Sequence, residues 1–147
     1  MKMAIYPGTF DPITNGHLDI IQRAVNLFEK VIVSVALNSE KGKTLFSKEE
    51  RLSLILQSVS DMPSIQVDSF KGLMVDHAVK HSANAAIRGL RALSDFEFEF
   101  QMALMNRSLN EEISTVFLMP HAKYTHVSSS MVREVASLGG KVSEYVP

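Results

Sequence analysis

One segment near the N-terminus, Ala4–His17, combines residue types that suit phosphate binding; it reads AIYPGTFDPITNGH. Thr14 or Asn15 can cap a helix, and that cap places Gly16 and His17 in the first helical turn. The free N–H groups and positive dipole end of such a turn favour phosphate, and His17 adds a directed donor. A tight turn and a chance histidine would explain the individual residues of this segment without a ligand. The complete run of residues is far more specific than any one of them alone, so we expect this segment to form a phosphate site.

A second segment, Ile87–Arg91, reads IRGLR and follows an apolar run directly. Arg88 and Arg91 flank a glycine where a buried strand should end, a place that suits arginines facing an anion, because a guanidinium can bind phosphate oxygens in pairs. The alternative is that both arginines lie on the surface in ion pairs with nearby carboxylates, of which the sequence offers Asp95, Glu97 and Glu99.

Two further segments could bind anions. Lys41-Gly42-Lys43 is a basic loop containing a glycine, and Ser128-Ser129-Ser130 supplies hydroxyls and amides at the start of a helix. Each also has an ordinary explanation, a solvated lysine loop in the first case and a serine cap in the second.

His77 and His81 are four residues apart on an expected helix, a spacing that can bind zinc. No acidic residue or third histidine follows nearby in the pattern. We therefore expect a partly exposed helix face there and no metal site. His121 is a loop residue without a clear signal.

The elements that must position these residues follow from periodicity. Short apolar runs predict five strands, at Met3–Tyr6, Val31–Leu37, Ile65–Val67, Ala85–Ile87 and Thr115–Met119. Apolar residues at helical spacing occupy 18–28 and 52–59. Capping boxes at Ser47–Glu50 and Ser94–Glu97 mark two helix starts. The alternating stretch 96–100 could be a strand, but the preceding capping box favours a helix. A last helix should begin among residues 128–130 and end at Gly139-Gly140.

This alternation predicts an α/β fold, a single-domain, Rossmann-like, doubly wound sheet of five parallel strands. In such a sheet, ligands bind beyond the carboxyl ends of the strands, where the strand order reverses. In a Rossmann-like order this point lies between the first and fourth strands. The loops that follow those strands are the two phosphate candidates, so we expect them to share one site.

The composition of the chain argues against several classes of function. The 147 residues carry 15 Lys and Arg against 16 Asp and Glu, a net charge of −1 that argues against general nucleic-acid binding. The lack of cysteine excludes disulfides, thiolate zinc sites and a cysteine nucleophile. No apolar stretch approaches the ~20 residues that span a bilayer, and Pro7-Gly8 comes too early for a signal peptide. We expect one domain, residues 1–147, that is cytoplasmic and binds neither nucleic acid nor membrane.

Three segments together resemble the phosphopantetheine adenylyltransferases: Ala4–His17, Ile87–Arg107 (IRGLRALSDFEFEFQMALMNR), and Ser128–Ser130 followed by Val132-Arg133-Glu134. The TNGH element alone is typical of the wider nucleotidyltransferase superfamily. The RGLRA and DFEFE elements narrow the resemblance to the phosphopantetheine adenylyltransferases. The similarity runs from Met3 to about Val146.

The resemblance implies transfer of AMP from ATP to 4′-phosphopantetheine, with Mg²⁺, giving dephospho-coenzyme A and pyrophosphate, in a homohexamer. It implies a catalytic role for His17. It implies an ATP site formed by Thr9, Phe10, His17, Gly89, Leu90, Arg91, Glu99, Tyr124, Thr125, His126, Val127, Ser128, Ser129 and Ser130. It implies an acceptor site formed by Thr9, Lys41, Met74 and Arg88.

The sequence departs from the family pattern at three places. The loop at residues 41–43 is one residue longer than usual, so Lys43 could replace Lys41. His126 stands where an aromatic residue is common, and members commonly continue into a further C-terminal helix beyond the position of Pro147. Two alternatives stay open. One is a related transferase that uses nicotinamide mononucleotide as its acceptor or uses a cytidine nucleotide, and the other is a non-catalytic nucleotide-binding module.

Overall fold

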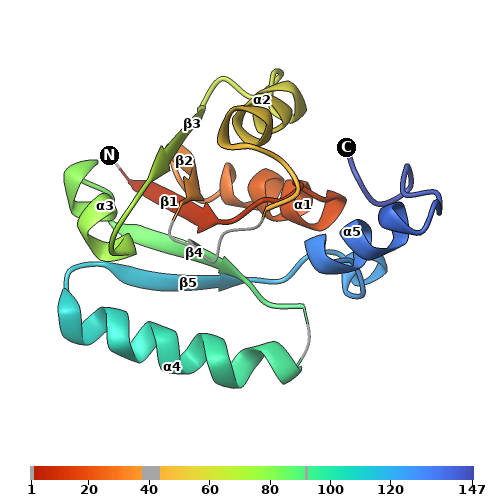
Figure 1. Ribbon diagram of the computed structural model, residues 1–147. Coiled ribbons are helices and arrows are strands. Elements are labelled where there is room, and N and C mark those ends of the chain that lie inside the picture. The colour runs from red at the N-terminus through yellow and green to blue at the C-terminus, as the bar shows by residue number, and fades with distance from the viewer. Residues whose placement is uncertain (1, 38–43, 92) are drawn as a thin grey trace.

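The computed structural model describes residues 2–37, 44–91 and 93–147, in which strands and helices alternate along the chain (Figure 1). The predicted lysine loop, with Lys41 and Lys43, lies outside the described residues.

The five predicted strands are all present: β1 (Met3–Gly8), β2 (Lys30–Ala36), β3 (Ile65–Phe70), β4 (Ala85–Gly89) and β5 (Ser114–Leu118). Three strands, β1, β3 and β4, extend two or three residues beyond the apolar runs that predicted them. Polar residues at the carboxyl ends of β3 and β4 extend those strands because backbone pairing continues past the last apolar side chain, as in the pairing of Ser34 with Asp68.

The helices are α1 (Asn15–Ala24), α2 (Lys48–Ser58), α3 (Met74–Lys80), α4 (Leu93–Leu109) and α5 (Ser129–Ser137), with a 3₁₀ turn η1 (Ala122–Tyr124) before α5. The ambiguous stretch 96–100 is helical, as predicted. Helix α4 begins at Leu93, one residue before the Ser94 at which the sequence predicted its capping box to start. The predicted cap of α2 at Ser47 is confirmed, as are Ser128 before α5 and the left-handed Gly139 after it.

The sheet order is β3-β2-β1-β4-β5, and every pairing is parallel. The strand order therefore reverses between β1 and β4, as predicted. This reversal sends the loops after these two strands to opposite sides of one opening.

Helices cover both faces of the sheet. On one face, α1 and α2 pack through Ile20, Ile21 and Ile55 against buried valines of β2. On the other face, Ala78 of α3 packs with Ile5 and Ile32, and α4 lies along β5 (Figure 1). Helix α5 lies beyond the carboxyl ends of β4 and β5, on the side where the two candidate loops meet (Figure 1). Within the described residues, no helix has both the length and the apolar character needed to cross a membrane.

Candidate active site

A pocket of about 290 Å³ opens at the carboxyl ends of β1 and β4, and the first turns of α1 and α5 complete its wall. It brings together most of the residues predicted to bind ATP or the acceptor: Thr9, Phe10, His17, Arg88, Gly89, Arg91, Glu99, Val127, Ser128, Ser129 and Ser130. The two loops singled out by their residue types thus share one cavity.

His17 is fixed by a capping box at the start of α1. Thr14 Oγ accepts a hydrogen bond from the His17 backbone N–H (3.3 Å), and the Thr14 backbone N–H donates to His17 Nδ1 (2.9 Å). Because Nδ1 accepts a hydrogen bond, the proton of the neutral ring sits on Nε2. The imidazole is therefore oriented as a donor through Nε2.

The surroundings keep this ring neutral. The pKa of His17 is lowered from 6.5 to about 4, chiefly by desolvation and in addition by the positive charges of Arg91 and Arg88. At neutral pH the imidazole offers an uncharged N–H, so it can donate a hydrogen bond to an anion without supplying a proton.

Gly16 leaves the first turn of α1 open. A Cβ built there would meet only ordinary contacts, 3.6 Å from Thr14 Oγ and 3.7 Å from Tyr124 Cβ. The protein itself therefore does not demand glycine at this position. The Gly16 backbone N–H is among the first-turn donors that no helix can pair internally, and glycine lets a ligand reach it.

Arg88 forms the ion pair that the sequence offered as one alternative, and it also lines the pocket. Its Nε and Nη2 donate to the two Glu99 oxygens (2.9 and 3.0 Å), and Nη1 donates to the Pro7 carbonyl (3.0 Å). Desolvation alone would lower the pKa of Arg88, but the hydrogen bonds and charge of Glu99 outweigh it and raise the pKa. Three of the five guanidinium N–H groups are thus used, which leaves two for an anion in the pocket.

Arg91 follows the same pattern on the exposed rim. Its Nη2 lies 3.3 Å from Asp95 Oδ1, and its backbone N–H donates to Asp95 Oδ2 (3.1 Å). Exposed pairs of this kind contribute little to stability, so the pair can open to admit a phosphate. Asp95 was foreseen only as an ion-pair partner, yet it also lines the pocket.

The serines at the start of α5 each use the hydroxyl in a hydrogen bond within the protein. Ser128 Oγ accepts from the Met131 N–H (3.1 Å), Ser129 Oγ donates to the Pro12 carbonyl (2.7 Å), and Ser130 Oγ accepts from Arg133 Nη2 (3.2 Å). The unpaired donors that a helix start offers are its first-turn backbone N–H groups. These amides, more than the hydroxyls, suit an anion.

Buried polar residues hold the loop after β1 in place. Arg51 of α2 is 5% exposed and donates to the Thr9 carbonyl (3.0 Å), and Arg133 of α5 donates to the Asp11 carbonyl (2.6 Å). The Asp11 carboxylate accepts from the Leu45 and Phe46 amides (2.7 and 2.9 Å). Two segments distant in sequence, residues 45–51 and Arg133, therefore fix the loop after β1.

Phe10 adopts a left-handed backbone, with φ at +50°. This conformation is rare for a bulky residue and persists only where the surroundings enforce it. Its ring is buried and packs edge-on against Tyr6 (5.3 Å between centroids) and His17 (4.9 Å). Tyr6, which the sequence did not single out, thus forms the floor of the pocket. Burial raises its pKa well above the ordinary value, so its hydroxyl stays protonated.

Several predicted site residues do not line the pocket. Leu90 donates its backbone N–H to Leu118, the Thr125 hydroxyl donates to Ala122, and the His126 ring contacts Tyr145. Tyr124 backs Gly16, and Met74 packs into the core on the α3 side of the sheet. Pocket residues without a prior assignment include Pro120, Ile20 and Pro7.

The expectation for His77 and His81 needs correction. The His81 side chain is partly exposed (29%), as predicted, but the His77 side chain is buried (5%). The acidic residue that the pattern lacked comes from the preceding strand: Asp68 of β3 contacts both rings. The sequence pattern was considered only beyond the two histidines, whereas Asp68 lies nine positions before His77.

The cytidylyltransferase-like family matches residues 5–135. The chain is 56% identical to the phosphopantetheine adenylyltransferase of Desulfosudis oleivorans over all 147 residues, which cover 87% of that relative. It is also 56% identical to the Moorella thermoacetica enzyme of that name and 54% identical to that of Caldanaerobacter subterraneus, each over the whole chain and 91% of the relative.

Solved structures share the fold at much lower identity. A bifunctional NMN adenylyltransferase/ADP ribose pyrophosphatase from Francisella tularensis superposes with a TM-score of 0.75 at 16% identity, over 99% of this chain and 44% of that one. A putative nicotinate-nucleotide adenylyltransferase from Vibrio parahaemolyticus gives 0.72 at 17% identity, over 99% and 87%. These likenesses show the fold alone.

Proposed function

Because the chain belongs to the phosphopantetheine adenylyltransferases of the cytidylyltransferase-like family, we propose that the pocket between β1 and β4 carries out their reaction. The protein is an adenylyltransferase of coenzyme A synthesis, and it transfers AMP from ATP to 4′-phosphopantetheine to give dephospho-coenzyme A and pyrophosphate. The observation that carries the assignment of the reaction to this pocket is His17, a neutral donor held at a helix start between two arginines.

ATP binds through its phosphates at the helix starts. Gly16 in the first turn of α1 and Ser128–Ser130 at the start of α5 line the pocket, so both helix dipoles have their positive ends beside it. Arg91 adds a charge at the rim and exchanges Asp95 for a phosphate oxygen.

The transfer itself needs alignment and charge stabilisation. A phosphate oxygen of the acceptor forms a bond to the α-phosphorus of ATP, the bond from that phosphorus to the bridging oxygen breaks, and pyrophosphate leaves. The acceptor monoester has a second pKa near 6 and is largely dianionic at neutral pH, so no general base is required. His17 Nε2–H donates to an α-phosphate oxygen as charge develops there, and no covalent enzyme intermediate forms.

Arg88 holds the acceptor phosphate with the two N–H groups that Glu99 and Pro7 leave over. Glu99 is then a positioning residue, because it fixes the plane of the guanidinium. Thr9 lines the same pocket and donates from the loop after β1. Met74 at the start of α3 and a lysine of the 41–43 loop complete the proposed acceptor site by family resemblance.

The pocket fits Mg²⁺ that arrives with ATP. Both carboxylates among the described lining residues, Asp95 and Glu99, are paired with arginines. The remaining oxygen donors are hydroxyls and carbonyls, so the ion is held mainly by phosphate oxygens and water. When bound, Mg²⁺ neutralises charge on the phosphates.

The proposal includes three properties of the whole protein. The chain acts as one nucleotidyltransferase domain, it works in the cytoplasm without nucleic acid or membrane partners, and it assembles as a homohexamer. The absence of cysteine and the near-neutral net charge support the second property. The resemblance to the family supports the third.

Pyrophosphate release, measured with two acceptors, tests the assignment. We expect turnover with ATP and 4′-phosphopantetheine and little with nicotinamide mononucleotide. Arg88→Ala should weaken acceptor binding more than ATP binding, by roughly 2–5 kcal/mol if the arginine–phosphate pair is well desolvated. Arg91→Ala is the matched control, since it should raise the KM for ATP more than the KM for the acceptor.

Equal use of both acceptors would contradict the assignment of the substrate. An Arg88→Ala variant that is impaired only toward ATP would contradict the assignment of the acceptor site.

A further inference from the structure

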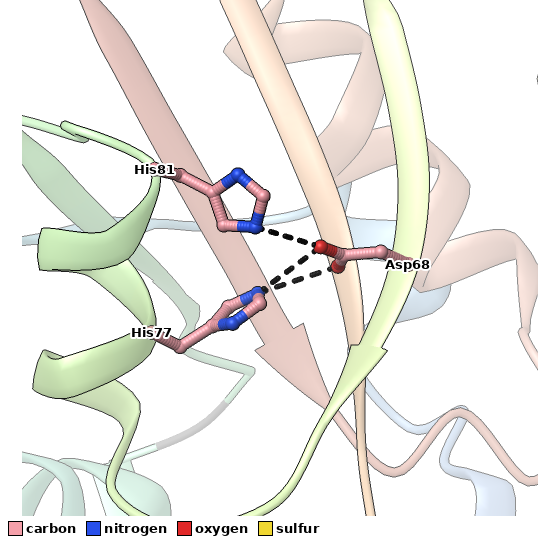
Figure 2. A group of neighbouring side chains, drawn as sticks. All are labelled: Asp68, His77 and His81. Atoms are coloured by element: carbon pink, nitrogen blue, oxygen red, sulfur yellow. Dashed lines mark hydrogen bonds and ion pairs between the residues drawn. The ribbon is translucent and has the colours of Figure 1, made fainter.

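We propose that Asp68, His77 and His81 form a binding site for a divalent transition-metal ion of the Zn²⁺ class. The three side chains point toward one another from two neighbouring elements (Figure 2). Asp68 lies in β3, His77 in the second turn of α3, and His81 caps the end of that helix. None of them lines the pocket between β1 and β4.

The distances between ligand atoms suit a metal ion. Asp68 Oδ2 lies 2.9 Å from His81 Nε2 and 3.3 Å from His77 Nε2, and the ligand atoms all lie within 4.8 Å of one another. Two ligands bound tetrahedrally to Zn²⁺ at ~2.0–2.1 Å are about 3.3–3.4 Å apart. Small side-chain rotations therefore bring the three atoms to coordination distance.

The donor set favours zinc or a similar ion over Mg²⁺ or Ca²⁺. Imidazole nitrogens bind Zn²⁺, Co²⁺ and related ions, whereas Mg²⁺ and Ca²⁺ prefer oxygen. Two histidines four residues apart with one carboxylate give three ligands and leave a fourth position for water. The partly exposed Asp68 and His81 side chains give solvent access to that position.

The surroundings restrict the buried ligand before an ion arrives. The His77 ring stacks on Phe70 (4.5 Å between centroids, 15° between planes), and Ser34 Oγ lies 3.1 Å from its Nε2. The stacking on Phe70 therefore restricts the ring plane, whereas an ion bound to Nε2 would replace the Ser34 hydrogen bond. Preorganisation of this kind reduces the entropy lost on binding.

An ion at this position would link α3 to the edge strand β3. Helix α3 has seven residues, and its N-cap residue, Leu73, makes no side-chain capping bond. Short helices depend on tertiary contacts for stability. The predicted effect of the ion is thus a stabilised α3, independent of the transfer reaction.

Metal binding to the chelator-treated chain, without ATP or acceptor, tests the proposal. Titration with Co²⁺, followed by its visible absorption, and competition with Zn²⁺ should show one ion per chain. Asp68→Asn and His81→Ala should each lower the affinity for the metal ion by about tenfold to a hundredfold or more. A loss of about tenfold to a hundredfold is typical even for residues that only hydrogen-bond to a metal ligand. His81→Cys, which restores a zinc ligand, should recover Zn²⁺ binding.

Thermal unfolding gives a second readout. Zn²⁺ at a hundred times its Kd should raise the Tm of the wild type by about 5–10 °C and should not raise that of His81→Ala. His121→Ala, which removes an exposed histidine outside the cluster, is the matched control and should bind Zn²⁺ like the wild type. The absence of saturable binding, or binding that persists unchanged in Asp68→Asn and His81→Ala, would overturn the proposal. Neither readout depends on the transfer reaction.

Discussion

At the scale of single residues, His17 shows how one contact decides a chemical role. Its Nδ1 is occupied by the Thr14 backbone N–H, so Nε2 carries the proton, and burial keeps the ring neutral. A charged imidazolium would bind phosphate more strongly in substrate and transition state alike. A neutral donor, aimed at one oxygen, contributes mainly where charge develops.

The titration of His17 can be predicted with its sign. The pKa of His17 is about 4 in the folded protein and 6.5 unfolded, so below pH 6.5 the unfolded state binds more protons. The free energy of unfolding should therefore fall as the pH drops from 6.5 to 4, by about 2 kcal/mol at pH 4.5 from this group.

His17→Gln isolates that contribution, because glutamine at this position preserves the capping box but does not titrate. Urea unfolding of both proteins from pH 7 to 4.5 should show a steeper loss for the wild type. Parallel stability curves would show that the His17 pKa is close to its ordinary value.

At the scale of elements, the capping box couples the stability of α1 to the geometry of the site. Thr14 is 2% exposed, and its hydroxyl accepts from the His17 amide. Thr14→Ala should cost about 1 kcal/mol in unfolding free energy and lower kcat, because the helix start that carries His17 loosens. Thr14→Ser keeps the hydroxyl and should match the wild type in both measurements. A Thr14→Ala variant with unchanged stability and kcat would separate the cap from the site.

The sequence predicted the elements better than it predicted contacts between them. Apolar runs locate all five strands because buried parallel strands need apolar residues on both faces. The pattern could not decide whether Arg88 binds a carboxylate or a ligand, since Glu99 of α4 reaches it only in the folded chain. Asp68 was missed for the same reason: its link to His77 depends on the β3–α3 connection and not on helical spacing.

At the scale of the whole molecule, α4 exposes apolar side chains on two opposite sides, among the residues that the structure describes. Phe96 and Phe100 stack on each other there (5.5 Å), and several large side chains are 42–63% exposed: Phe96, Phe98, Phe100, Met102, Leu104, Met105 and Leu109. One row along α4 consists of Phe96, Phe100 and Leu104, and a second row on the opposite side consists of Phe98, Met102, Met105 and Leu109. Exposed apolar surface of this extent typically marks an interface between proteins.

Assembly through α4 is therefore expected. Light scattering at micromolar concentration should give the mass of an oligomer, with a hexamer as the specific expectation from the family. Phe98→Glu, at the most exposed of the three phenylalanines, should shift the mass toward the monomer. A wild-type monomer at that concentration would refute the expectation.

The transfer rate of His17→Ala tests the central claim most directly, because the pocket between β1 and β4 is proposed to act through this donor. Single-turnover transfer of AMP should be measured with both substrates saturating, next to ATP affinity and with His121→Ala as control. The account predicts a rate at least about a hundredfold lower, the equivalent of roughly 3–4 kcal/mol, with ATP affinity changed far less. A His17→Ala variant that transfers AMP at nearly the wild-type rate would contradict it.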